Sequence, residues 1–241
     1  MNKVLIADSV SSAVSEVFDK NGIAYDTKIG LSEDELATEI TEYSGLIVRS
    51  AVTVTEKIIN SAINLKVIGR PGVGVDNVDL KAATNNGIVV MNTPLGNVQA
   101  TAELTFGIMH SLMRKISNAN QSMHQKKWEK KKFIGNEIYG KTIGIIGFGN
   151  IGKKVSQIAH AYGMNVLVYS ASISPEDEKK FNVTNQSIDD ILEGADIITF
   201  HNKLSENSKY LINSNAITKM KKNTIIINCA RGGLVNEKDI K

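Results

Sequence analysis

The sequence predicts an α/β protein with two open parallel sheets, one in each of two domains. Short runs of apolar and β-branched residues alternate with helical segments along the chain, and strands separated by helices pair in parallel through right-handed crossovers. Near residue 97 a long helical stretch interrupts this alternation, which resumes near residue 140. We therefore expect one open-sheet domain over residues 1–97 and a second over residues 98–241.

In the first domain, strands and helices follow one another regularly. The strand candidates are apolar runs at residues 4–8, 45–50, 66–70 and 88–93. Helix candidates lie at residues 10–20, 32–41, 55–62 and 79–85. The second of these helices opens with Ser32 and Glu35, a capping-box spacing in which each side chain accepts a hydrogen bond from the other residue's backbone N–H.

The second domain begins with residues 97–128, which are predicted to form one unusually long helix, either a strut between domains or a dimer surface. A new α/β series then starts with the strand TIGII at residues 142–146. Its later strands are predicted at residues 165–170, 195–200 and 224–230.

Charge and composition argue against several classes of protein. The net charge is +3, from 28 Lys and Arg against 25 Asp and Glu, too weak to indicate nucleic-acid binding. The lysine-rich run at residues 126–133 is interpreted as a solvated surface, with Trp128 and Phe133 packing onto the second domain. Cys229 is the single cysteine, so no internal disulfide can form, and no apolar run is long enough for a signal peptide or a bilayer span. We expect a cytoplasmic protein that binds no nucleic acid, no membrane and no metal.

The strongest local signal is the pattern Gly147-x-Gly149-x-x-Gly152, placed between a strand and a helix. The first glycine permits a tight turn, the second lets a pyrophosphate approach the backbone, and the third lets the helix pack on the strand. The helix N-terminus then supplies partial positive charge for the phosphates. The pattern predicts dinucleotide binding; glycines that merely make a tight βα turn are the alternative.

The end of the next strand departs from this fingerprint. Ser170 stands where an acidic residue is expected to hold the ribose hydroxyls. A serine neither chelates two hydroxyls nor repels a 2′-phosphate, and no Arg or Lys occurs between it and Lys179 to attract one. We expect NAD(H) to be used, with weaker binding and poor discrimination against NADP(H).

Arg231 follows the last predicted strand, in the stretch NCARGGLVNEK at residues 228–238. At the carboxyl end of a parallel strand it lies where open α/β sheets bind ligands, and its guanidinium can grip a carboxylate and a neighbouring carbonyl oxygen with paired donors. An arginine that ties a loop to an acidic neighbour is the structural alternative.

Several long stretches occur together and in order: GLIVRSAVTVT, LKVIGRPGVGVDNVDLKAATNNGIVVMNTPLGN, AELTFGIMHSLMR, KWEKKKFIGNEIYGKTIGIIGFGNIG and NCARGGLVNE. Together they closely resemble the D-2-hydroxyacid dehydrogenase family, from about residue 3 to the last residue. The resemblance implies a flavodoxin-like substrate domain (residues 1–97), a Rossmann cofactor domain (residues 98–241) that binds NAD, and an active site in the cleft between them. It also implies oxidation of a phosphorylated 2-hydroxy acid, 3-phospho-D-glycerate, in the first step of serine synthesis, by a homodimer or homotetramer.

The resemblance also assigns roles to residues. Arg231 would be catalytic, orienting the substrate carboxylate and polarising its C2 oxygen. The implied cofactor contacts, besides the three glycines and Ser170, are Val73, Asn150, Ile151, Asn202, Cys229, Ala230 and Arg231. Valine and asparagine stand at residues 73 and 202, where the family has threonine. The implied substrate contacts are Arg49, Ser50, Arg70, Gly72, Val73, Gly74 and Asn97. Here the backbone N–H groups of residues 72–74 could form an anion-binding nest.

Family members take a proton donor–acceptor histidine, and the acidic residue that holds it, from segments a few dozen residues beyond the arginine. The chain ends before either residue appears, so we expect an amino-terminal fragment, with the Rossmann domain incomplete and turnover negligible. His201 is the only contender for a substitute. Two other functions remain open: a glyoxylate or hydroxypyruvate reductase of the same family, and a non-catalytic NAD(H)-sensing binding protein.

Overall fold

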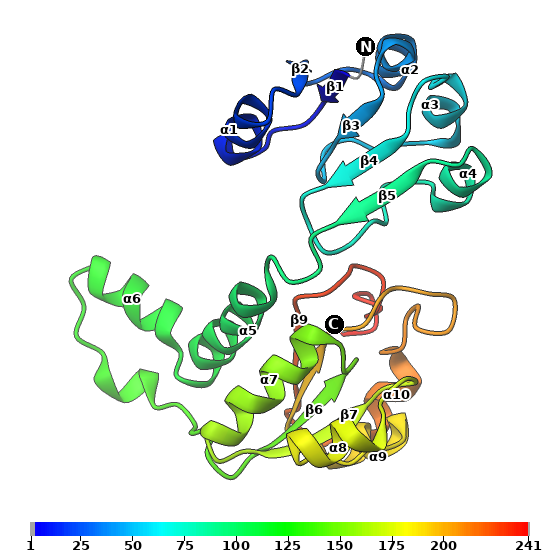
Figure 1. Cartoon of the computed structure of the whole chain (residues 1–241). Helices are drawn as coiled ribbons and strands as arrows, with labels where there is room; N and C mark the ends of the chain where they lie inside the picture. Colours follow the sequence, from blue (N-terminus) through cyan, green and yellow to red (C-terminus); the bar gives the residue numbers. More distant parts are fainter. Residues whose placement is uncertain (1–2, 241) are drawn as a thin grey trace. The chain divides into compact units, whose positions relative to one another are not determined.

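The computed structural model describes residues 3–240, in which the chain divides into two compact units, unit 1 (Met1–Asn97) and unit 2 (Val98–Lys241) (Figure 1). Each unit has its own parallel sheet and its own apolar core. The predicted fold class, α/β with two parallel sheets, is confirmed.

Unit 1 is built on a parallel sheet of five strands in the order β2-β1-β3-β4-β5. These strands are β1 (Lys3–Ile6), β2 (Ala24–Thr27), β3 (Gly45–Ile47), β4 (Val67–Arg70) and β5 (Val89–Asn92). The helices between them are α1 (Ser12–Lys20), α2 (Glu33–Glu39), the 3-10 turn η1 (Ile40–Glu42), α3 (Glu56–Ser61) and α4 (Leu80–Asn85). This strand order is flavodoxin-like, as the resemblance implies.

Local signals explain most of these elements. The capping box at the start of α2 is present, since Ser32 N–H donates to Glu35 Oε2 at 2.8 Å and Glu35 N–H donates to the Ser32 hydroxyl. Strand β2 is not predicted from the sequence, because it lies at the edge of the sheet and carries little apolar surface. It pairs in parallel with β1, and the Tyr43 hydroxyl adds a hydrogen bond to Asp26 Oδ2 at 2.6 Å.

The core of unit 1 lies between the sheet and helices α2, α3 and α4. Leu5, Leu46 and Ile68, from three neighbouring strands, are fully buried together with Leu36 and Ile58 from the helices. Burial of each such side chain contributes about 1.5–3 kcal/mol to folding. The carboxyl ends of β1, β3 and β4 thus meet at one edge of a rigid sheet, where their loops can carry polar groups.

Unit 2 has a parallel sheet in the order β7-β6-β8-β9. Its strands are β6 (Thr142–Ile146), β7 (Asn165–Tyr169), β8 (Ile197–Phe200) and β9 (Ile225–Asn228). Its helices are α5 (Val98–Met113), α6 (Ile116–His124), η2 (Lys130–Phe133), α7 (Asn150–Ala161), α8 (Pro175–Phe181), α9 (Ile188–Gly194) and α10 (Ser214–Lys219). A single parallel bridge between Val168 and Asn185 extends the pairing beyond β7.

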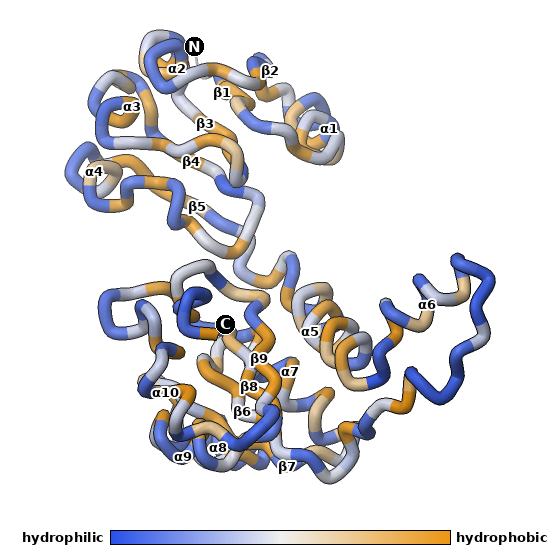
Figure 2. Tube along the Cα trace, turned by 180° about the vertical axis from the view of Figure 1, so that it is seen from behind, coloured by the Kyte–Doolittle hydropathy of each residue, from blue (hydrophilic) through white to orange (hydrophobic). Residues whose placement is uncertain are grey.

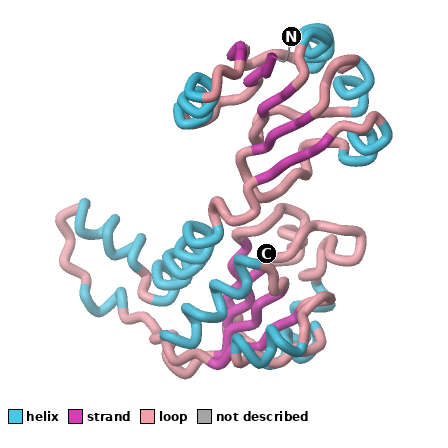
Figure 3. Tube along the Cα trace, viewed as in Figure 1, coloured by secondary structure: helices cyan, strands magenta, loops and turns pink. Residues whose placement is uncertain are grey.

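The sheet of unit 2 is buried on both faces, so its strands are nearly all apolar (Figure 2). Ile145 faces a cluster with Phe106 on α5 and Val155 on α7, whereas the adjacent Ile146 faces a cluster with Ile191 on α9. In Figure 3 the strands of this unit accordingly have helices on both sides. This doubly wound arrangement is the Rossmann type, and it fixes the carboxyl ends of β6, β8 and β9 at one edge.

The predicted long helix over residues 97–128 is wrong. Helices α5 and α6 are separate, with Lys115 between them in the left-handed conformation (φ 53°, ψ 36°). The backbone N–H of Asn136 donates to the carbonyl of Met113 at 2.8 Å, and Gly135 lies so close that a Cβ there would overlap this carbonyl. A continuing helix would need the same oxygen for the N–H four residues on. The returning chain therefore ends α5.

Candidate functional site

The glycine loop after β6 has the geometry that its spacing predicts. Gly147 has φ of 98°, and a Cβ on it would lie 2.5 Å from the backbone nitrogen of Asn202. Gly152, in the first turn of α7, lies directly against the Gly147 carbonyl oxygen, which a Cβ would overlap. The first glycine thus permits the turn beside β8, and the third permits helix α7 to pack on the loop.

The second glycine of the loop faces open space. A Cβ on Gly149 would meet no atom within 4 Å, although the residue adopts φ of −79°, which any amino acid tolerates. Gly149 is also the N-cap of α7, and no side chain caps this helix end. The first N–H groups of a helix without such a cap attract anions, and the helix dipole reinforces the attraction. The loop is therefore a cradle that fits a pyrophosphate.

The strand order of unit 2 reverses between β6 and β8, which is where open α/β sheets bind ligands. His201 and Asn202 follow β8 at this point. Among the described residues, His201 Nδ1 and Asn202 Oδ1 are buried without a hydrogen-bond partner. Buried polar atoms are nearly always paired, so these two atoms, like the similarly buried His110 Nε2, have hydrogen-bonding capacity that the described residues do not use. The backbone of these two residues lies against Gly147.

His201 is held in a neutral state. Burial lowers its pKa from 6.5 to about 4, and its Nε2 lies 3.0 Å from the Thr199 hydroxyl on its own strand. A general base must reach the proton that it removes. This ring is turned into its own unit, so it is a poor substitute for a catalytic histidine.

The end of β7 is held by a residue that the sequence reasoning missed. The N–H of Ser170 donates to Asn185 Oδ1 at 2.9 Å, and Asn185 Nδ2 donates back to the Ser170 carbonyl at 3.1 Å. The N–H of Ser172 donates to the Ser170 hydroxyl at 3.4 Å. Ser170 thus occupies a fixed turn. The parallel bridge between Val168 and Asn185 brings Asn185 next to Ser170. This pairing is tertiary, so the sequence pattern does not reveal it.

Arg231 follows β9 in a turn that Asn228 organises. Asn228 Oδ1 accepts the N–H of Ala230 at 3.0 Å, and Asn228 Nδ2 donates to the Arg231 carbonyl at 2.8 Å. The Arg231 side chain is half-buried, and its Nη1 donates to the Ala230 carbonyl at 3.0 Å. Cys229 is half-buried and packs against the unit 2 core. The arginine is therefore displayed from a rigid turn at the same edge as the glycine loop.

Unit 1 contains the second set of predicted site residues, at the carboxyl ends of β1, β3 and β4. Asp8, which sequence reasoning also missed, is buried at the end of β1. Its Oδ2 accepts the N–H groups of Arg49 and Ala51 at 2.9 and 3.0 Å, and its Oδ1 accepts that of Ser9 at 2.7 Å. Asp8 thereby shapes the loop that carries Arg49 and the exposed Ser50.

The loop after β4 carries the remaining predicted contacts. The Arg70 guanidinium lies against Gly72, where any Cβ would overlap Nη1. The carbonyls of Gly72 and Val73 accept hydrogen bonds from Thr93 N–H (2.9 Å) and Asn92 Nδ2 (2.7 Å). This tie to the end of β5 fixes the predicted anion nest, which continues through the half-buried Gly74, whereas Asn97 is exposed at the end of the unit.

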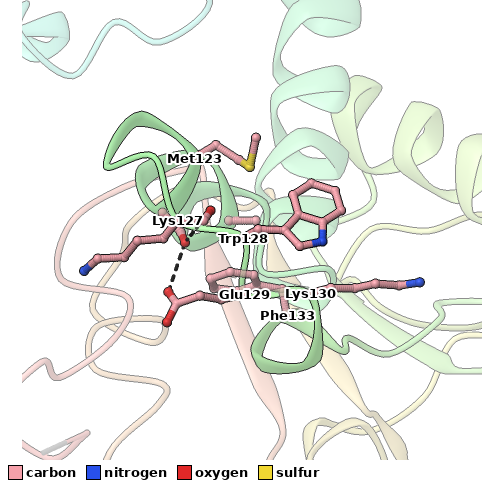
Figure 4. A pocket seen from close by; sticks show the side chains of 8 residues that line it. Met123, Lys127, Trp128, Glu129, Lys130 and Phe133 are labelled. Carbon is pink, nitrogen blue, oxygen red and sulfur yellow. Dashed lines mark hydrogen bonds between the residues drawn. The ribbon is translucent and has the colours of Figure 1, made fainter.

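A separate pocket lies between α6 and η2 (Figure 4). Its lining is Ala119, Ser122, Met123, Lys127, Trp128, Glu129, Lys130 and Phe133. Trp128 is 80% exposed, so the expected packing of its ring onto the second domain is wrong. The chain from α6 onward turns back as a separate arm, held by the Ser122 hydroxyl donating to Glu129 Oε2 at 3.0 Å.

Comparison with known proteins gives consistent results. Residues 106–241 match the family described as D-isomer specific 2-hydroxyacid dehydrogenase, NAD binding domain. The chain is 45% identical over 237 residues to D-3-phosphoglycerate dehydrogenase from Homo sapiens, covering 98% of this chain and 44% of that protein. It is 42% identical over 239 residues to the protein of the same name from Bacillus subtilis (strain 168), covering 98% and 45%. The chain thus spans less than half the length of these curated relatives.

Solved structures show the same fold. The TT0316 protein from Thermus thermophilus superposes with a TM-score of 0.89 at 28% identity, covering 99% of this chain and 76% of that one. The PH0520 protein from Pyrococcus horikoshii gives 0.85 at 29% identity, covering 100% and 73%. Among the described residues, none of the helices has the length and apolarity of a bilayer span.

Proposed function

The chain belongs to the D-isomer specific 2-hydroxyacid dehydrogenase family, with NAD as its cofactor, and we propose that it is the substrate- and NAD-binding part of an enzyme that oxidises 3-phospho-D-glycerate to 3-phosphohydroxypyruvate. The substrate assignment is supported by 42–45% identity to proteins named D-3-phosphoglycerate dehydrogenase. The observation that carries the cofactor chemistry is the open cradle at Gly149, at the uncapped end of α7. We assign to unit 2 the NAD site and the arginine that orients the substrate carboxylate, and to unit 1 the other substrate-binding arginines.

The residues of unit 2 would hold and orient the cofactor. The backbone N–H groups of Asn150 and Ile151 would bind its pyrophosphate, and Ser170 its adenosine ribose. Asn202 Oδ1 would accept a hydrogen bond from the nucleotide, and Cys229 and Ala230 would border its nicotinamide. When bound, NAD supplies the ring that accepts the hydride from C2 of the substrate.

Arginines would bind the two anionic groups of the substrate. Arg231 would grip the carboxylate and the C2 oxygen with paired N–H donors, which stabilises the negative charge that develops on this oxygen as the hydroxyl proton leaves. Arg49 and Arg70 would bind the phosphate and carboxylate, with Ser50, Asn97 and the backbone N–H groups of Gly72, Val73 and Gly74 as further polar contacts. The C2 hydroxyl must also lose its proton, and the burial of His201 makes it a poor acceptor.

The experiment is NADH production by the complete product of the gene that encodes this chain. We expect turnover of 3-phospho-D-glycerate and little turnover of D-glycerate, and we expect Arg231→Ala to lower kcat/KM by about 10²–10³-fold, as for loss of one oxyanion donor. Equal activity on both substrates would indicate a hydroxypyruvate-type reductase instead. NADH binding without turnover of any 2-hydroxy acid would indicate a non-catalytic sensor.

We further propose that the protein is a homo-oligomer in the cytoplasm and that the arm beyond α5 forms part of its dimer surface. Ile116, Met123 and Trp128 on this arm are 51–80% exposed, and Met123 and Trp128 line the same pocket. Exposed apolar patches mark interaction sites. Sedimentation velocity tests this assignment: Trp128→Ser should shift a dimer toward monomer, and an unchanged dimer would contradict it.

A further inference from the structure

Asn77, in the loop after β4, uses its whole carboxamide to join three backbone and side-chain groups of unit 1. Its Oδ1 accepts a hydrogen bond from Arg70 Nε at 3.0 Å. Its Nδ2 donates to the carbonyls of Arg49 at 2.5 Å and Val52 at 2.6 Å. The side chain therefore connects the loop after β3 with the guanidinium of Arg70, the last residue of β4.

Only an amide fits this set of partners. Two carbonyl oxygens require two N–H donors, and the guanidinium N–H requires an acceptor, so the orientation of the amide is fixed by its surroundings. The backbone of Asn77 is fixed as well, because its carbonyl accepts the N–H of Val54 at 2.7 Å beside the parallel bridge between Val54 and Val78. Asn77 thus has little freedom to adjust if one partner moves.

Both arginines are restrained through this contact. The backbone of Arg49 is held at its N–H by Asp8 and at its carbonyl by Asn77. Arg70 has its Nε–H bound by Asn77 and its Nη1 against Gly72, so the plane of its guanidinium is set from two sides. An arginine that is already ordered loses less side-chain entropy when it binds an anion.

We propose that Asn77 is the positioning residue that orients Arg49 and Arg70 for the phosphate and carboxylate of the substrate. This role rests on the proposed function, in which the two arginines bind those groups. Asn77 acts through the arginines and does not itself touch the substrate. A lysine at residue 70 lacks the planar guanidinium and its Nε–H group. Asn77 Oδ1 could therefore not fix the orientation of a lysine side chain as it fixes that of Arg70.

The first test is steady-state kinetics of the complete gene product. Asn77→Ala should raise KM for 3-phospho-D-glycerate about 10-fold, the effect of losing a hydrogen bond to a charged group, with KM for NAD and kcat nearly unchanged. Asn64→Ala is the matched control, because Asn64 Nδ2 donates to a single carbonyl, that of Thr41 (2.9 Å), just before β4 begins. This control should leave both KM values unchanged.

A double-mutant cycle separates positioning from general loop stability. If Asn77 acts through Arg70, Asn77→Ala should raise KM much less in an Arg70→Lys background than in the wild type. The full 10-fold effect in both backgrounds, or an unchanged KM in the single variant, would overturn the inference. A wild-type protein that does not turn over 3-phospho-D-glycerate would disprove the proposed function itself. The positioning role of Asn77 would then be disproved as well, because it rests on that function.

An NMR signal of the 241-residue chain reports the contact without turnover. The Nε–H resonance of Arg70, identified by its loss in Arg70→Lys, should exchange slowly with water in the wild type and rapidly in Asn77→Ala. Asn64→Ala should leave it slow. Rapid exchange already in the wild type would show that Asn77 does not hold this guanidinium and would overturn the proposal.

Discussion

Replacing Gly149 by alanine should abolish tight NADH binding while leaving the fold intact. The residue has φ of −79° and ψ of −162°, which alanine adopts without strain, and the new methyl group would meet no protein atom within 4 Å. At a compatible position, Gly→Ala stabilises a protein by about 0.4–1 kcal/mol because the unfolded chain loses freedom. The stability of the variant should therefore be equal to or above that of the wild type.

Binding should respond in the opposite direction. The space beside Gly149 is where the pyrophosphate must approach the first N–H groups of α7, and a methyl group there would push it away. Loss of one hydrogen bond to a charged phosphate costs about 1.5–3 kcal/mol, which corresponds to roughly 10–100-fold in Kd. We expect a weakening in this range, without any loss of stability.

Two other glycines of unit 2 serve as controls. Gly152→Ala would drive a Cβ into the Gly147 carbonyl oxygen, a backbone overlap that we expect to destabilise the protein by about 2–3 kcal/mol. Gly107 lies inside α5 with no atom within 4 Å of its Cβ position, so Gly107→Ala should stabilise by about 0.5–1 kcal/mol and leave NADH binding unchanged.

Urea unfolding gives the stability of each variant, and titration of NADH fluorescence gives its Kd. If Gly149→Ala bound NADH as tightly as the wild type, no phosphate could lie over this residue. If Gly149→Ala unfolded as readily as Gly152→Ala, the open space beside Gly149 would not exist.

Two further changes test other parts of unit 2. Ser170→Asp introduces the carboxylate that commonly holds the ribose hydroxyls, so it should tighten NADH binding about 10-fold and weaken NADPH binding. Parallel titrations with the two nucleotides measure both effects. An equal change in affinity for both nucleotides would contradict the ribose assignment. Burial lowers the pKa of His201 from 6.5 to about 4, so as the pH falls the unfolded chain binds a proton at this residue before the folded chain does. The stability present above pH 6.5 is therefore lost as the pH falls toward 4, by roughly 3 kcal/mol at most. His201→Asn should remove most of this loss in urea unfolding at pH 7 and 5, and an equal loss in both proteins would show that other groups cause it.

Periodicity and glycine spacing were sufficient to predict the positions of most strands and the loop after β6. The roles of Gly147, Gly149 and Gly152 follow from backbone geometry alone, which explains why a short pattern is informative there. Strand β2 could not be predicted, because an edge strand held by Asp26 and Tyr43 has no apolar signal of its own.

Other features depend on contacts between distant residues and leave little trace in a single sequence. The end of α5 is set by Asn136, which lies 23 residues beyond the carbonyl that it binds. Asp8 and Asn77 act on loops 41 and 28 residues away along the chain, and neither residue type indicates such a role by itself. Sequence reasoning therefore identified the glycines of the motif more readily than residues such as Asp8 and Asn77, which shape the loops around the candidate site.

A crystal structure of the chain with NADH would show whether the nucleotide lies over the glycine loop of unit 2. We expect pyrophosphate oxygens about 3 Å from the backbone nitrogens of Asn150 or Ile151, with Gly149 beneath them. NADH bound elsewhere on the chain, with those two N–H groups facing only water, would contradict this placement.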